Sequence, residues 1–163
     1  YDFQIIRAAN GVTKTFTLLH QDLTGTVGGG TCGSARPFTE SIDPYDLVSV
    51  SGTSFTVQPG NFNCSLSAVG YSSGNFTARV LNTTAATTAA TYTNQAPTGT
   101  QSPINFGFNM NLAAAATFQI DQTCEYAPAT PSLALGLSGA SFGGAAQTFA
   151  TLICTAVDEA ATN

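Results

Sequence analysis

The sequence predicts an all-β protein: an antiparallel β-sandwich, Ig-like or jelly-roll-like, with two intrachain disulfides and long Gly/Thr-rich loops. Apolar and polar residues alternate with a period of two wherever a period can be read. Hydrophobic residues make up 43% of the 163 positions, which is enough for a folded core. The length suits a single domain over residues 1–163. Alanine-rich stretches are too short to predict helices.

The first element, residues 1–19, is expected to form an N-terminal hairpin or a strand donated to a neighbouring subunit. The stretch "VTKTFTL", residues 12–18, places Phe16 and Leu18 on one face and three threonines on the other. A preceding strand, "FQII", is joined to it through Asn10-Gly11, a pair that tolerates positive φ. Donation to another subunit would use the apolar residues Phe3, Ile5 and Ile6.

A second hairpin is predicted from "FNCSLSAV" and "NFTARVL", joined by the Gly-rich turn "GYSSG". Its expected inward side chains are Phe62, Cys64, Leu66, Ala68, Phe76, Ala78 and Val80.

The clearest alternation lies in "INFGFNMNL", which predicts a strand over residues 104–112. The stretches "TFQI", "SLALGL" and "QTFATLICTAV" predict further strands. Two segments lack a core-forming pattern and are expected to be loops: residues 20–46, rich in Gly and Pro, and the Thr/Ala-rich, low-complexity residues 83–103. The inward side chains expected in the clearest strand are Ile104, Phe106, Phe108, Met110 and Leu112.

The four cysteines, Cys32, Cys64, Cys124 and Cys154, lack the short spacing of zinc or redox motifs and predict two disulfides. Of the three pairings, we favour Cys32–Cys64 with Cys124–Cys154, because the two closed loops are then similar in length. Disulfides indicate an oxidising compartment. The chain starts at Tyr1 without an initiating Met, so we expect a mature extracellular or cell-surface chain whose leader has been removed.

Charge excludes some partners. Only 8% of residues are charged, and the four basic residues are dispersed, so nucleic acid is not an expected partner. No apolar run is long enough to span a membrane, and no cofactor is expected. The neutral, Thr-rich composition is typical of a protein exposed to changing pH and salt.

No catalytic constellation is apparent. The single histidine, His20, is expected at a strand end or on the surface, and no enzyme activity is predicted. Glu40, Asp43 and Asp46 form a weak Ca²⁺ candidate; the alternative is solvated loop acids, with a helix-cap or turn role for Asp43. The chain has no Trp for a typical sugar-binding face, and four tyrosines are the candidates to take that role: Tyr45, Tyr71, Tyr92 and Tyr126.

Three Asn-x-Ser/Thr triplets make Asn63, Asn75 and Asn82 candidates for N-glycosylation. The alternation that places Cys64 and Phe76 inward places Asn63 and Asn75 outward. Glycans there would shield this part of the surface from subunit contacts.

These features favour a structural subunit of an extracellular assembly, such as a pilus, filament or surface coat, that polymerises head to tail with copies of itself by β-strand addition. In that layout the chain is similar to donor-strand pilus subunits, without a family motif that matches residue by residue. The alternative is a monomeric secreted module that binds carbohydrates or cell surfaces, with surface glycans as partners. A small secreted hydrolase and a viral coat protein are the remaining hypotheses.

Overall fold

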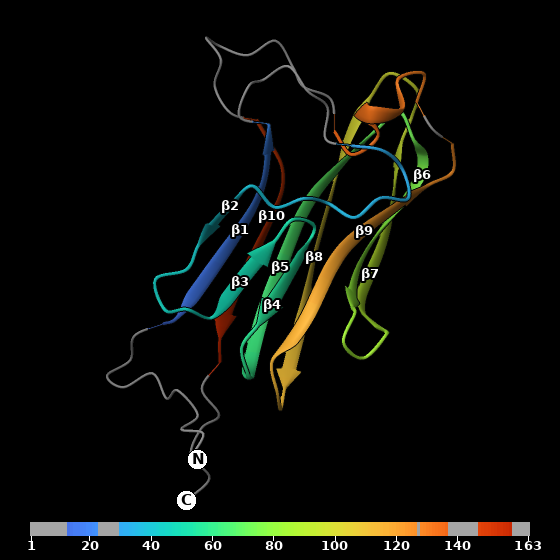
Figure 1. Ribbon diagram of the computed structural model, residues 1–163. Helices are drawn as coiled ribbons and strands as arrows, with labels where there is room; N and C mark the ends of the chain where they lie inside the picture. Colours follow the sequence, from blue (N-terminus) through green and yellow to red (C-terminus); the bar gives the residue numbers. More distant parts are fainter. Residues whose placement is uncertain (1–12, 23–29, 127, 137–146, 158–163) are drawn as a thin grey trace, which may run out of the picture.

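The computed structural model describes residues 13–22, 30–126, 128–136 and 147–157 (Figure 1). These residues form ten strands in two antiparallel sheets that pack as a sandwich, which confirms the predicted fold class. Sheet A has the order β2-β1-β10-β5-β8, and sheet B has the order β3-β4-β9-β6-β7. The strands are β1 Thr15–Asp22, β2 Glu40–Ile42, β3 Val48–Ser51, β4 Ser54–Val57, β5 Gly60–Tyr71, β6 Gly74–Asn82, β7 Thr87–Ala96, β8 Gln101–Leu112, β9 Ala116–Cys124 and β10 Gln147–Ala156.

The core lies between the sheets and follows the predicted alternation. Phe16 of β1 meets Phe62 of β5 edge to face, with ring centroids 6.0 Å apart. On the opposite sheet, Phe55 of β4 stacks on Phe118 of β9 at 5.7 Å, and Phe38 packs edge-on against Phe55. All five rings are buried, and each contributes about 2–3 kcal/mol by leaving water.

The predicted second hairpin is wrong, although its inward residues are correct. β5 lies in sheet A and β6 in sheet B, so the turn between them carries the chain across the sandwich. All seven predicted inward side chains are buried. A hairpin within one sheet and a connection between the two sheets both require apolar residues at alternate positions, so the alternation is the same. Gly74 lies in this turn with φ +64, and a Cβ there would come within 2.5 Å of the Tyr126 ring. A glycine is therefore required at this position.

Two further predictions of local structure are wrong. The low-complexity tract 83–103 contains β7 and the start of β8, because β-branched Thr suits an edge strand with one exposed face. The stretch "SLALGL", residues 132–137, was predicted as a strand, but Pro131–Leu133 form a short 3₁₀ helix. The long connection 20–46 contains the end of β1 and the short strand β2.

Both disulfides form, but the favoured pairing is wrong: the bonds join Cys32 to Cys124 and Cys64 to Cys154. Cys64 of β5 stands directly opposite Cys154 of β10, with Cα atoms 4.1 Å apart. The other bond fastens the segment before β2 to the end of β9. Loop-length arguments concern the unfolded chain, whereas strand order decides which cysteines meet.

The donor residues Phe3, Ile5 and Ile6 lie outside the described residues, as does the first strand of the predicted N-terminal hairpin. The two five-stranded sheets are formed by the ten strands of the described residues. Within the described part of the chain, no helix is long and apolar enough to cross a membrane.

Candidate functional site

One edge of the sandwich is open and aromatic. β8 is the last strand of sheet A and β7 the last strand of sheet B, and the two contact each other along this edge (Figure 1). Inward side chains of an edge strand have a neighbouring strand on one side only. Ile104 and Met110 are nevertheless buried, whereas Phe106 and Phe108 stay half-exposed. Both phenylalanines were predicted to lie in the core.

Tyr92 of β7 extends this row of rings and is 50% exposed. Its ring stacks on Phe106 with centroids 6.0 Å apart and an interplanar angle of 12°. Phe108 follows along β8, 6.1 Å from Phe106. We call these three residues the aromatic edge. Tyr92 is exposed and the two phenylalanines are partly exposed, and aromatic rings on a surface are typical of protein contact sites.

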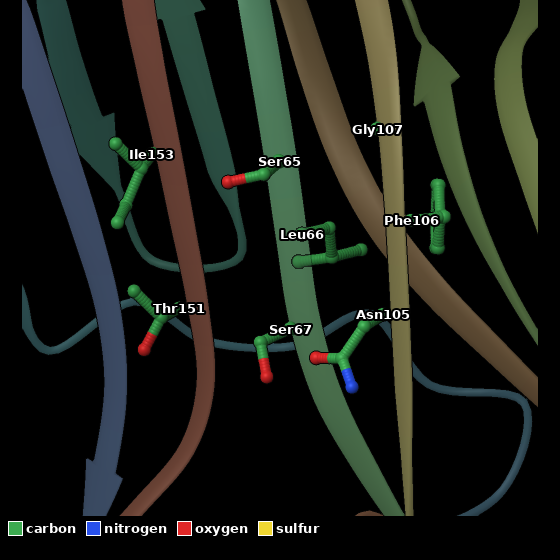
Figure 2. A pocket seen from close by; sticks show the side chains of 8 residues that line it. All are labelled: Ser65, Leu66, Ser67, Asn105, Phe106, Gly107, Thr151 and Ile153. Carbon is green, nitrogen blue, oxygen red and sulfur yellow. The ribbon is translucent and has the colours of Figure 1, made fainter.

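The outer face of sheet A meets the aromatic edge at β8. Alternate residues of β10, β5 and β8 surround a hollow of about 330 Å³, which lies where Gly107 has no side chain (Figure 2). Ile153, 40% exposed, supplies an apolar wall. The outer-face residues, here called the amide face, are Asn63, Ser65, Ser67, Asn105, Gly107, Asn109, Thr151 and Ile153.

Both surfaces are free of charge. The four strands that form them, β5, β7, β8 and β10, contain no Lys, Arg, Asp or Glu. The main cost of burying a protein surface, the desolvation of unpaired charges, is therefore absent here.

Polar groups on the two sheet faces differ in their hydrogen bonding. On sheet B, hydroxyls of neighbouring strands bond each other, Thr56 to Thr117 at 2.9 Å and Thr77 to Thr93 at 2.8 Å. Arg79 also pairs with Asp121 there. On the amide face, none of the described Asn or Ser side chains makes a hydrogen bond within the chain. Their donors and acceptors remain available to a partner.

A second cluster of polar residues, which no sequence pattern predicted, is buried at one end of the sandwich. Arg36 has no exposed surface. Its Nη1 donates to the carbonyls of Leu135 at 3.0 Å and Phe149 at 3.4 Å, and its Nη2 donates to the carbonyl of Val69 at 2.5 Å and to Oε1 of Gln122. Burial lowers the pKa of Arg36 to about 9, so the side chain stays charged at neutral pH. The guanidinium thereby ties both sheets to the segment 133–136.

His20, which was expected at a strand end or on the surface, lies near the end of β1 and belongs to this buried cluster. Its side chain is 4% exposed, with Nδ1 3.4 Å from Nη1 of Arg36. Burial, and secondarily the charge of Arg36, lowers the pKa of His20 from 6.5 to about 4. A neutral, enclosed imidazole packed against Phe149 is a structural group.

The structure does not gather the Ca²⁺ candidates into a site. Asp43 accepts backbone N–H bonds from Tyr45 at 3.3 Å and Val48 at 2.7 Å, which is the turn role considered as the alternative. Within the described residues, no three acidic, His or Cys side chains group as metal ligands, and Glu40 and Asp46 are exposed.

The four tyrosines lie on different elements and form no common platform. Tyr92 belongs to the aromatic edge, and Tyr71 is half-buried at the end of β5. Tyr45 lies between β2 and β3 beneath the ammonium of Lys14, and Tyr126 follows β9. Of the glycosylation candidates, Asn63 and Asn75 are exposed as predicted, and Asn82 is half-buried. Their modification stays a prediction.

Comparison with known proteins shows similarity in fold alone. No protein-family model and no curated protein matches the sequence. The globular domain of zebrafish complement 1qA superposes with a TM-score of 0.59 at 13% identity, over 91% of this chain and 100% of that domain. Murine APRIL, in its pH 5.0 structure, superposes with a TM-score of 0.60 at 10% identity, over 90% of this chain and 100% of that chain.

The predicted pilus or filament subunit is therefore wrong: the solved structures that share this architecture are complement 1qA and APRIL domains. Strand donation and head-to-tail polymerisation receive no support from these comparisons. The alternative of a secreted module agrees in part, but carbohydrate binding is not supported. The chain therefore shares a jelly-roll sandwich fold with the complement 1qA and APRIL domains.

Proposed function

We propose that this chain is an extracellular, non-enzymatic globular module that assembles into a closed homo-oligomer, in which the aromatic edge of one copy packs on the amide face of the next. The aromatic edge is the observation that carries the proposal: three adjacent rings, one of them 50% exposed, on strands without charge. Two disulfides and the fold shared with complement 1qA and APRIL support the extracellular location.

The two surfaces are chemically complementary. Burying an aromatic ring on a partner removes up to about 150–250 Å² of surface from water, and Tyr and Phe are enriched in interface cores. The hollow at Gly107 offers space beside Ile153 for such a ring. Around it, the unbonded amides and hydroxyls supply the hydrogen bonds that an interface rim requires.

The positions of the surfaces favour a ring over a filament. A contact between two different surfaces is heterologous, and it forms a ring if the rotations between successive copies return to the first copy; otherwise it forms a helical filament. Here the two surfaces share β8 and lie on adjacent sides of one sandwich, its edge and its face. Each added copy therefore turns sharply relative to the last, so that a few copies close the ring.

Light scattering coupled to size exclusion tests the proposal directly. The wild type should have a mass that is a small multiple of 16.6 kDa. Gly107→Arg should reduce it to monomer, because the new side chain fills the hollow with a charge. The backbone tolerates a side chain there, since a Cβ would make only an ordinary 3.6 Å contact with the Cys64 carbonyl. Tyr92→Ser should also weaken assembly, by removing an exposed ring.

Thr123→Arg is the matched control, because it places the same exposed charge on the outer face of sheet B and should leave the mass unchanged. Mixing the face variant Gly107→Arg with the edge variant Tyr92→Ser should restore one intact contact and produce a heterodimer. A monomeric wild type at micromolar concentration, or a wild-type mass for Gly107→Arg, would contradict the proposal.

A further inference from the structure

The three glycosylation triplets lie on different sides of the sandwich. Asn63 is on β5, the middle strand of the amide face, opposite Asn109 of β8 and Thr155 of β10 and next to the row that contains Gly107. The third residue of its triplet, Ser65, lines the hollow (Figure 2). Asn75 and Asn82 stand at the two ends of β6 in sheet B. Only the first triplet therefore coincides with the proposed contact.

The side-chain environments of the sheet B asparagines suit modification. Oδ1 of Asn82 accepts the backbone N–H of Ala85 at 2.9 Å, which orients the amide and leaves Nδ2 without a partner among the described residues. Nδ2 of Asn75 donates to Glu125 at 2.9 Å, and its Oδ1 accepts from Gln95 at 2.8 Å. A glycosylated amide keeps one N–H, so the bond to Glu125 can persist after modification.

We infer that, in a host with N-glycosylation, the assembled protein carries N-linked glycans at Asn75 and Asn82 and an unmodified Asn63, and that a glycan on the amide face keeps a chain monomeric. This inference rests on the proposed assembly. In the modification, Nδ2 loses a proton and bonds to C1 of the first sugar of a lipid-pyrophosphate-linked oligosaccharide. The C1–O bond breaks, and the lipid pyrophosphate leaves with the electron pair.

The physical reason is steric. An oligosaccharide on Asn63 would cover Ser65, Asn109 and the hollow, where the aromatic edge of the next copy must pack. On sheet B the polar groups already bond one another, so glycans there displace no contact needed for assembly.

The test uses the full chain secreted from a eukaryotic host and separated by size exclusion, with glycopeptide mass spectrometry on each fraction. The oligomer should carry glycans at Asn75 and Asn82 and none at Asn63, and any Asn63 glycan should appear only in the monomer. Asn63→Gln should move all protein into the oligomer. A glycan at Asn63 in the oligomer, or bare Asn75 and Asn82, overturns the inference.

A designed glycosylation triplet tests the steric argument whether or not the host glycosylates Asn63. Asn111→Thr makes Asn109, opposite Asn63 on the same face, a new acceptor. Chains glycosylated at Asn109 should lose the oligomer peak, and the unglycosylated fraction of the same variant should retain it. Glycosylated chains that still assemble contradict the inference but leave the oligomer intact. If even Asn63→Gln is monomeric, the proposed assembly fails instead.

Discussion

Arg36 is expected to contribute strongly to the stability of one end of the sandwich. It is fully buried, and its guanidinium donates to four acceptors, three of which are backbone carbonyls. No carboxylate contacts it among the described residues, so carbonyl dipoles alone stabilise its charge. Removing such a donor leaves several acceptors without partners inside the protein, which costs more than the hydrogen bonds themselves contribute.

We therefore expect Arg36→Met to lower the free energy of unfolding by about 3 kcal/mol or more, measured by urea denaturation with the disulfides intact. Arg79→Met is the control, because the Arg79–Asp121 pair is exposed on sheet B and should contribute less than about 1 kcal/mol. Equal losses of unfolding free energy for the two variants would show that the buried Arg36 contributes no more to stability than the exposed Arg79.

His20 should make stability depend on pH. Its pKa is lowered from 6.5 to about 4, so between these values the unfolded chain binds the proton and the folded chain does not. The stabilisation is complete above pH 6.5 and decreases as the pH falls toward 4, by about 3 kcal/mol in total. Below pH 4 this contribution stays constant.

Because His20 is the only histidine, His20→Gln isolates this effect from the carboxylates, which titrate in both proteins. The expected result is a flatter curve of unfolding free energy against pH for the variant between pH 6.5 and 4. Parallel curves would mean that the imidazole titrates normally. Neither this burial nor that of Arg36 was predictable, because Arg36 binds backbone carbonyls of segments far apart in the sequence, and His20 packs against Arg36 and Phe149.

At the scale of elements, alternation predicted which residues face the core but not which strands pair. The strands over residues 62–80 and 104–112 have the expected inward sides, since a period of two reports burial on one face. The same period is compatible with a hairpin or with a crossing between sheets, so β5 and β6 were wrongly paired. The disulfide prediction failed for the same reason, because Cys64 meets Cys154 only once β5 and β10 are neighbours.

Strand order also explains why the candidate site could not be recognised. Phe106 and Phe108 have the alternation of a core strand, and only their position at the end of sheet A leaves them half-exposed. Tyr92 lies in a Thr/Ala-rich tract whose composition predicted a loop. The absence of charge from four strands was visible in the sequence, but its meaning depends on their forming adjacent surfaces.

For the whole molecule, the distribution of charge has a consequence for assembly. The chain has a formal net charge of −5, yet the aromatic edge and the amide face contain no charged side chain. Copies therefore repel one another weakly at long range, while the contact itself depends on apolar burial and neutral hydrogen bonds. Salt screens the repulsion between copies and leaves the uncharged contact almost unaffected.

We expect the oligomer to keep its mass when NaCl is raised from about 0.1 M to about 1 M, over which the screening length falls from about 10 Å to about 3 Å. Any change in the dissociation constant should be toward tighter assembly, because screening removes the repulsion between acidic copies. Sedimentation equilibrium at the two salt concentrations measures this. An oligomer that dissociates in high salt must be held by ion pairs, and since the two proposed surfaces have none, its interface would have to lie elsewhere on the molecule.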